Sequence, residues 1–90
     1  MKCISVYTND FAQFADIYEK VLATPIGDEE EKDVDGVTVN GSGEVPADYV
    51  ERMKAKPDVV VMKLKDKGIT VLQRGDVFEM LIPDTENMIH

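Results

Sequence analysis

The sequence predicts an α/β (α+β) fold: a single small two-layer sandwich in which two helices cover one face of a mixed sheet of four or five strands. Three observations lead to this prediction. The 90 residues suffice for one domain with one core. Short segments rich in β-branched residues predict strands. Two segments of helical periodicity interrupt them, so the expected order is strand, helix, strand, helix, strand, strand, followed by one ambiguous element.

Residues 2–7 predict the first strand because apolar and polar residues alternate there and β-branched residues are frequent. Residues 10–23 predict the first helix, with an N-cap supplied by one of the polar residues 8–10. The apolar side chains of this helix recur at the spacing of one buried stripe, and they are Phe11, Phe14, Ala15, Tyr18, Val21 and Leu22.

The middle of the chain predicts a loop, a strand and a helix. Residues 27–36 form the expected acidic loop, because carboxylates crowd this segment and a glycine stands at each end. A short strand over 36–40 follows and is closed by the glycine-rich residues 41–43. Pro46 suits the first position of a second helix, which Pro57 should end, because the residue before a proline is pushed out of the helical region.

The second half of the chain predicts a meander of strands. Residues 58–65 and 69–74 are expected to form two strands joined by a tight turn. Residues 76–82 fit two structures. Asp76 and Glu79 mimic the capping box of a helix, whereas the Val, Phe and Ile content favours a fifth strand.

The limits of the domain and its compartment follow from the same patterns. The single globular domain is expected to span 1–83, and 84–90 to form a flexible C-terminal tail. The first residues lack the long apolar region of a signal peptide, and no segment approaches the roughly 20 apolar residues that span a bilayer. Since Cys3 is the only cysteine, no internal disulfide is expected. These features predict a cytoplasmic protein without membrane contact.

Charge is distributed unevenly along the chain. The net charge is −8, residues 28–35 (the acidic block) contribute −5, and residues 50–75 carry +4. A negative net charge works against the phosphate contacts that give nucleic-acid binding its affinity. The acidic block is therefore interpreted as one pole of a dipolar surface.

The acidic block is the first candidate site, as a weak cation site or a partner-contact loop. Its carboxylates belong to Asp28, Glu29, Glu30, Glu31, Asp33 and Asp35. The stretch from Glu31 to Gly36 resembles the opening of a calcium loop, where a glycine makes the sharp bend. Such a loop begins with Asp and has its bidentate Glu at the twelfth position, which is Ser42 here. A solvated connection without function is the alternative.

The basic segment offers a second candidate, a contact for an anion at Lys63, Lys65 and Lys67. These lysines alternate along a strand and its turn, so they share one face. Sheets that bind RNA add exposed aromatic side chains, whereas most aromatic residues here fit helical core stripes. Lysines on an edge strand also protect a sheet against aggregation.

The sequence lacks the parts of the common catalytic sites. Its only histidine is His90, and its only cysteine is Cys3, so neither a Ser-His-Asp or Cys-His arrangement nor a zinc site is expected. The glycines do not have the spacing of a nucleotide-binding loop. We therefore expect a protein that is not an enzyme and that carries no cofactor.

The stretch from Tyr7 to Leu22 resembles the first strand and helix of glyoxalase-like modules. The metal-binding His and Glu of those modules have no counterparts in this sequence. The resemblance therefore implies no function for this chain.

The function expected from these observations is protein binding or regulation by a small acidic domain, with a protein partner or a second copy of the chain. An exposed strand face could carry this contact, and its candidate residues are Val59, Val61, Leu72, Val77 and Leu81. The alternatives are an inhibitor that imitates nucleic acid and a protein that binds a small molecule or a weakly held divalent cation.

Overall fold

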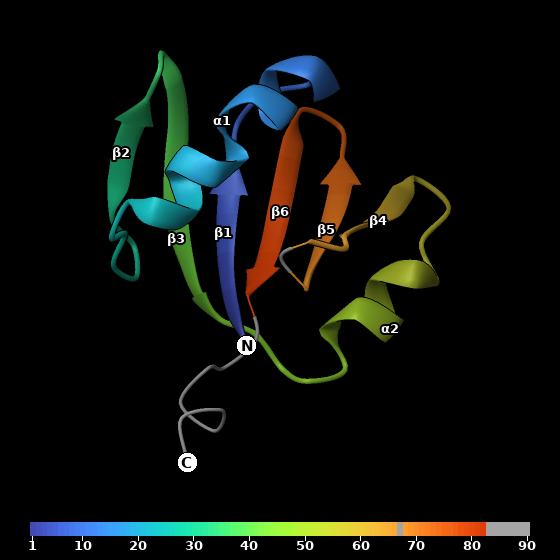
Figure 1. The fold of residues 1–90 in the computed structure, drawn as a ribbon. Helices are drawn as coiled ribbons and strands as arrows, with labels where there is room; N and C mark the ends of the chain where they lie inside the picture. Colours follow the sequence, from blue (N-terminus) through green and yellow to red (C-terminus); the bar gives the residue numbers. More distant parts are fainter. Residues whose placement is uncertain (67, 83–90) are drawn as a thin grey trace.

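The computed structural model describes residues 1–66 and 68–82. Its elements are, in chain order, β1 (Lys2–Val6), α1 (Phe11–Ala23), β2 (Glu31–Val34), β3 (Val37–Glu44), α2 (Tyr49–Lys54), β4 (Val59–Leu64), β5 (Ile69–Arg74) and β6 (Val77–Ile82). The strands form one antiparallel six-stranded sheet in the order β2-β3-β1-β6-β5-β4 (Figure 1). The first and last strands are therefore neighbours at the centre of the sheet.

The predicted α+β class with two helices is confirmed, but the predicted sheet differs in several details. The sheet is antiparallel throughout rather than mixed, and it has six strands rather than four or five. The additional strand is β2, which lies inside the segment predicted as an acidic loop. The ambiguous segment 76–82 forms β6, a strand. The predicted tail, 84–90, lies outside the described residues.

The strand β2 exists because a tight turn folds it back onto β3. Asp35 and Gly36 occupy the two central positions of this turn and have positive φ angles of 52° and 85°. This is the geometry of a type I′ turn, whose twist matches that of paired strands. Val34 and Val37 face each other across the turn and are both buried.

The helix α1 covers one face of the sheet and forms the larger core with it. The Asp10 side chain caps the helix by accepting a hydrogen bond from the Ala12 amide at 2.9 Å. Phe14 stacks on Phe78 with ring centroids 4.6 Å apart. Burying an aromatic side chain of this size stabilises the fold by about 1.5–3 kcal/mol. The predicted stripe was wrong at Phe11, which is 53% exposed, and at Ala15, which is also exposed, and it omitted the buried Ile17.

The helix α2 packs against the opposite face of the sheet. The predicted two-layer sandwich, with both helices on one face, is therefore wrong. A smaller core of Cys3, Leu72 and Leu81 is buried there. The residues that pack around it include Tyr49, Val50 and Met53 of α2. The molecule therefore has three layers where α2 covers the sheet, with the last strands of the chain between the two helices.

Residues 41–43 lie within β3 and not in a loop between a strand and a helix, as the glycines had suggested. Here the sheet has an irregularity in the pairing of β1 with β3, between Cys3 and Ile4. Gly41 is buried, and an added Cβ would lie 2.1 Å from the carbonyl oxygen of Gly27. A glycine is required at this position because two backbone segments approach so closely.

Candidate partner-binding edge

The strand β4 forms one edge of the sheet. Among the described strands it pairs only with β5, in an unbroken register from Val59 opposite Arg74 to Leu64 opposite Ile69. On its outer side, alternate backbone N–H and C=O groups therefore have no sheet partner in the described part of the chain. An unbroken outer edge of this kind is a template on which another extended segment can pair.

The side chains of β4 do not protect this edge. Val60 is 52% exposed and stands on the same face as Met62 and Leu64, which pack at the margin of the larger core. The strand contains no proline and no bulge, and its one charged residue, Lys63, lies near its end. Over most of the strand, apolar side chains thus border a backbone edge that no strand of the described residues pairs with.

The strand β2 forms the other edge and is built differently. It has four residues, of which Glu31 and Asp33 are exposed. Short length and outward charges are the ordinary means by which proteins prevent edge-to-edge pairing. The contrast between the two edges singles out β4 as the accessible one.

The five residues that the sequence suggested for an association face lie on the α2 side of the sheet. They are Val59, Val61, Leu72, Val77 and Leu81. Leu72 and Leu81 have exposed fractions of 0% and 1%, because α2 and its neighbours already cover them. Val59, Val61 and Val77 remain partly exposed. The β4 edge is consequently a better candidate for contact with a partner than the α2 side of the sheet as a whole.

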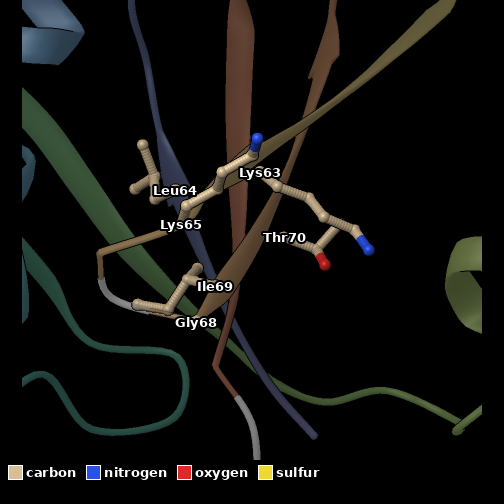
Figure 2. A pocket seen from close by; sticks show the side chains of 6 residues that line it. All are labelled: Lys63, Leu64, Lys65, Gly68, Ile69 and Thr70. Carbon is tan, nitrogen blue, oxygen red and sulfur yellow. The ribbon is translucent and has the colours of Figure 1, made fainter.

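A hollow of about 190 Å³ lies at the end of the β4–β5 hairpin. Its lining residues are Lys63, Leu64, Lys65, Gly68, Ile69 and Thr70 (Figure 2). The structure thus brings together two of the three lysines proposed as an anion contact, and Lys67 lies outside the described residues. Figure 2 shows that the ammonium groups of Lys63 and Lys65 extend in different directions rather than converging over the hollow. Two ammonium groups that do not converge are poorly placed to bind one anion together.

The acidic block is divided between a turn, the strand β2 and the hairpin turn that follows. Glu30 accepts a hydrogen bond from the Gly27 amide at 2.8 Å. This bond, with the nearby Lys32 ammonium, lowers the pKa of the Glu30 carboxyl. Asp33 accepts from the Gly36 amide at 2.8 Å, and Asp35 forms an ion pair with Lys20 of α1. Several of the carboxylates therefore shape the local backbone.

The remaining members of the block, Asp28, Glu29 and Glu31, are exposed. Within residues 1–66 and 68–82, no three His, Cys, Asp or Glu side chains are grouped so that they could hold a metal ion. The block is best described as an acidic surface at the β2 end of the sheet. Its charge is far from the β4 edge, because the two strands are at opposite ends of the sheet.

A buried polar cluster beneath α2 was missed by sequence reasoning, which had placed Glu79 at a helix cap or on a solvent face. Glu79 is only 8% exposed, and its Oε1 accepts a hydrogen bond from the Tyr49 hydroxyl at 2.8 Å. Ser5 lies opposite Glu79 in the sheet and shares a 2.7 Å hydrogen bond with Ser42. The one available signal was the alternation of β6, which places Glu79 on the same face as Leu81.

Two groups of this cluster, the Cys3 thiol and the Tyr49 hydroxyl, stay protonated near neutral pH. Burial, followed by the charge of Glu79, raises the pKa of the Cys3 thiol to about 11. Burial and the hydrogen bond to Glu79 raise the pKa of the Tyr49 hydroxyl to about 12. A reactive cysteine requires a lowered pKa and access to solvent, and Cys3 has neither. The cluster therefore holds α2 to the sheet and does not provide a nucleophile.

Comparisons of the chain with protein-family models, with curated proteins and with solved structures found no match. The candidate site is therefore argued from the geometry of this chain. Neither α1 nor α2, the helices of the described part of the chain, has the length and apolar character needed to cross a bilayer.

Proposed function

We propose that this chain is a non-enzymatic protein-binding module that pairs an extended segment of a partner with the outer edge of β4. The observation that carries the proposal is the contrast between the two edges of the sheet. The β4 edge is regular and bears the exposed Val60, whereas the β2 edge is short and acidic. Strand addition at such an edge gains affinity from backbone hydrogen bonds and specificity from alternate side chains.

The side chains of β4 define what kind of segment fits. On the α1 side, Val60 and Met62 would pack against apolar residues of the added strand. On the α2 side, Lys63 lies near the end of the strand and disfavours a residue of like charge at the opposite position. A segment with apolar residues at alternate positions is therefore the preferred partner. Cytoplasmic placement is part of the proposal, and the free, buried Cys3 is compatible with a reducing compartment.

The proposal is tested by selecting linear peptides from a displayed random library on the purified protein. Selected peptides are expected to alternate apolar and polar residues and to bind the wild-type protein. They should lose affinity for the Val60→Glu variant, because the added carboxylate faces the apolar side of the new strand. Thr38→Glu is the matched control, since Thr38 is also an exposed strand residue but lies on β3. Peptides that bind the two variants equally well would count against the β4 edge.

A further inference from the structure

We infer that the natural occupant of the β4 edge is a second copy of this chain, paired β4 to β4 in antiparallel orientation about a two-fold axis through Val61. This inference rests on the proposed function of the edge and names its partner. The two sheets would then form one continuous sheet of twelve strands, six from each copy. The axis is perpendicular to the sheet, so both α1 helices lie on the same side.

The register follows from the alternation of side chains. Residues directly opposite each other in an antiparallel pair point to the same face, so β4 can pair with itself only when residues of the same parity are opposed. With Val61 on the axis, Val60 lies opposite Met62 of the second copy. This contact occurs twice, once on each side of the axis. It covers the apolar side chain that the single chain leaves 52% exposed.

The same register keeps like charges apart. Lys63 lies opposite Val59 of the second copy, so the two Lys63 side chains are at opposite ends of the paired strands. Like charges directly opposite each other would destabilise the pair, and this register avoids that arrangement.

The distribution of the −8 net charge also favours this geometry. Pairing through β4 places the two acidic blocks at the outermost strands of the twelve-stranded sheet. At about 4.8 Å between neighbouring strands, eleven intervals separate them by roughly 53 Å. This distance greatly exceeds the Debye length of about 8 Å at physiological ionic strength. Repulsion between the acidic blocks therefore does not oppose association.

The competing arrangement pairs β4 of one copy with β2 of the next. Its charges would match, because Lys63 would meet the carboxylates of Glu31 or Asp33. However, β2 has four residues and β4 has six, so β2 covers less of the exposed edge. A head-to-tail contact of this kind also leaves a free edge at each end of a dimer, so it adds further copies until the assembly closes into a ring or grows as a filament. Only the two-fold arrangement covers β4 completely in a closed dimer.

The register is tested by disulfide trapping with the double variant V60C/M62C. Opposite residues have Cβ atoms about 4.5–5.5 Å apart, close to disulfide distance, whereas diagonal neighbours are about 7–8 Å apart. Under mild oxidation at high micromolar concentration, the double variant is expected to become mostly covalent dimer. Each single variant should stay monomeric on a non-reducing gel. The single variants retain the buried Cys3 and therefore also control for cross-linking through that residue.

Two outcomes would overturn the inference. Efficient cross-linking of M62C alone would place Met62 on the axis and contradict the register. Failure of the double variant to cross-link, with wild-type protein sedimenting as a monomer at the same concentration, would exclude the dimer. A wild-type dimer whose dissociation constant rises at least about tenfold in Val60→Glu, and not in Thr38→Glu, would support it without any introduced cysteine.

These results also separate the inference from the proposed function. A monomeric protein that still binds selected peptides at β4 would retain the strand-binding function and exclude the second copy as its occupant. A monomer that selects no β4-dependent peptide would overturn both.

Discussion

Tyr49 of α2 donates its hydroxyl hydrogen to the buried carboxylate of Glu79 at the centre of the sheet, over 2.8 Å. This bond matters because α2 has only six residues, no fully buried residue and no side-chain hydrogen bond at its N-cap. Isolated helices of this length are not stable in water. The helix therefore depends on its contacts with the sheet, and Tyr49 supplies both an apolar ring and a hydrogen bond to Glu79.

Replacing Tyr49 with Phe should destabilise the protein by about 1–3 kcal/mol, because Glu79 would lose its hydroxyl donor while remaining largely buried. The measurement is urea-induced unfolding followed by circular dichroism. Tyr7→Phe is the control, since Tyr7 is 46% exposed and the change removes the same hydroxyl from the surface. Equal urea midpoints for the two variants would show that the bond to Glu79 does not stabilise the fold.

Cys3 should react slowly with thiol reagents in the folded protein. Its pKa is raised from 9.0 to about 11 by burial and by Glu79, so near pH 8 its thiolate is about 100-fold scarcer than that of an unperturbed thiol. Reaction with a chromogenic disulfide reagent should accelerate at least about 100-fold in urea. A fast reaction in the native state would mean that α2 leaves the sheet frequently.

The same shift predicts a loss of stability in alkali. A raised pKa in the folded state stabilises the protein fully below pH 9.0, and this contribution is lost as the pH rises through about 11. Wild-type protein should therefore lose more stability than Cys3→Ala between these two pH values. Urea midpoints at several pH values provide the measurement, and parallel pH profiles for the two proteins would contradict it.

Gly41→Ala should be among the most damaging single substitutions. The new methyl group would lie 2.1 Å from the Gly27 carbonyl oxygen, so one of the two backbone segments must move. Overpacking of this kind costs about 1–3 kcal/mol. Gly27→Ala is a matched control on the other side of the same contact, since its methyl group would meet only the Glu30 side chain at 3.8 Å. Thermal unfolding of both variants tests the difference.

Glu30 should contribute stability that disappears in acid. Its pKa is lowered by the Gly27 amide and by Lys32, so its contribution is present above its ordinary pKa of 4.5 and is lost as the pH falls through the folded value. Glu30→Ala should unfold at lower urea concentration than Glu31→Ala near pH 7. The two variants remove the same charge, so their midpoints should converge near pH 3. If the urea midpoints of the two variants still differed near pH 3, the Glu30 carboxylate would not be the cause of the difference.

Local patterns in the sequence predicted most of the elements, while their arrangement depended on contacts between distant residues. The helix α1 was predictable because Phe14 and Val21 repeat at helical spacing, and the strands β4 and β5 because β-branched runs flank a turn. The strand β2 was not, since its exposed carboxylates suit a loop and only the turn at Asp35 and Gly36 determines the pairing.

The candidate site was predictable only in part. The sequence suggested that residues of β4 contact a partner, but it could not show that α2 covers Leu72 and Leu81. The edge position of β4 depends on the sheet order, which is set by long-range pairing. Glu79 was misplaced for the same reason, because its burial depends on Tyr49, which is thirty residues away in sequence.

The central pairing of β1 with β6 has a consequence for synthesis. Lys2 of β1 lies opposite Ile82 of β6. The centre of the sheet therefore cannot form until β6, the last described strand, has been synthesised. While the ribosome is still translating residues 77–82, the flank of β1 that will receive β6 is unoccupied, and so is that of β5. Contacts of such large sequence separation slow folding. We therefore expect the nascent polypeptide to remain protease-sensitive until β6 has left the exit tunnel.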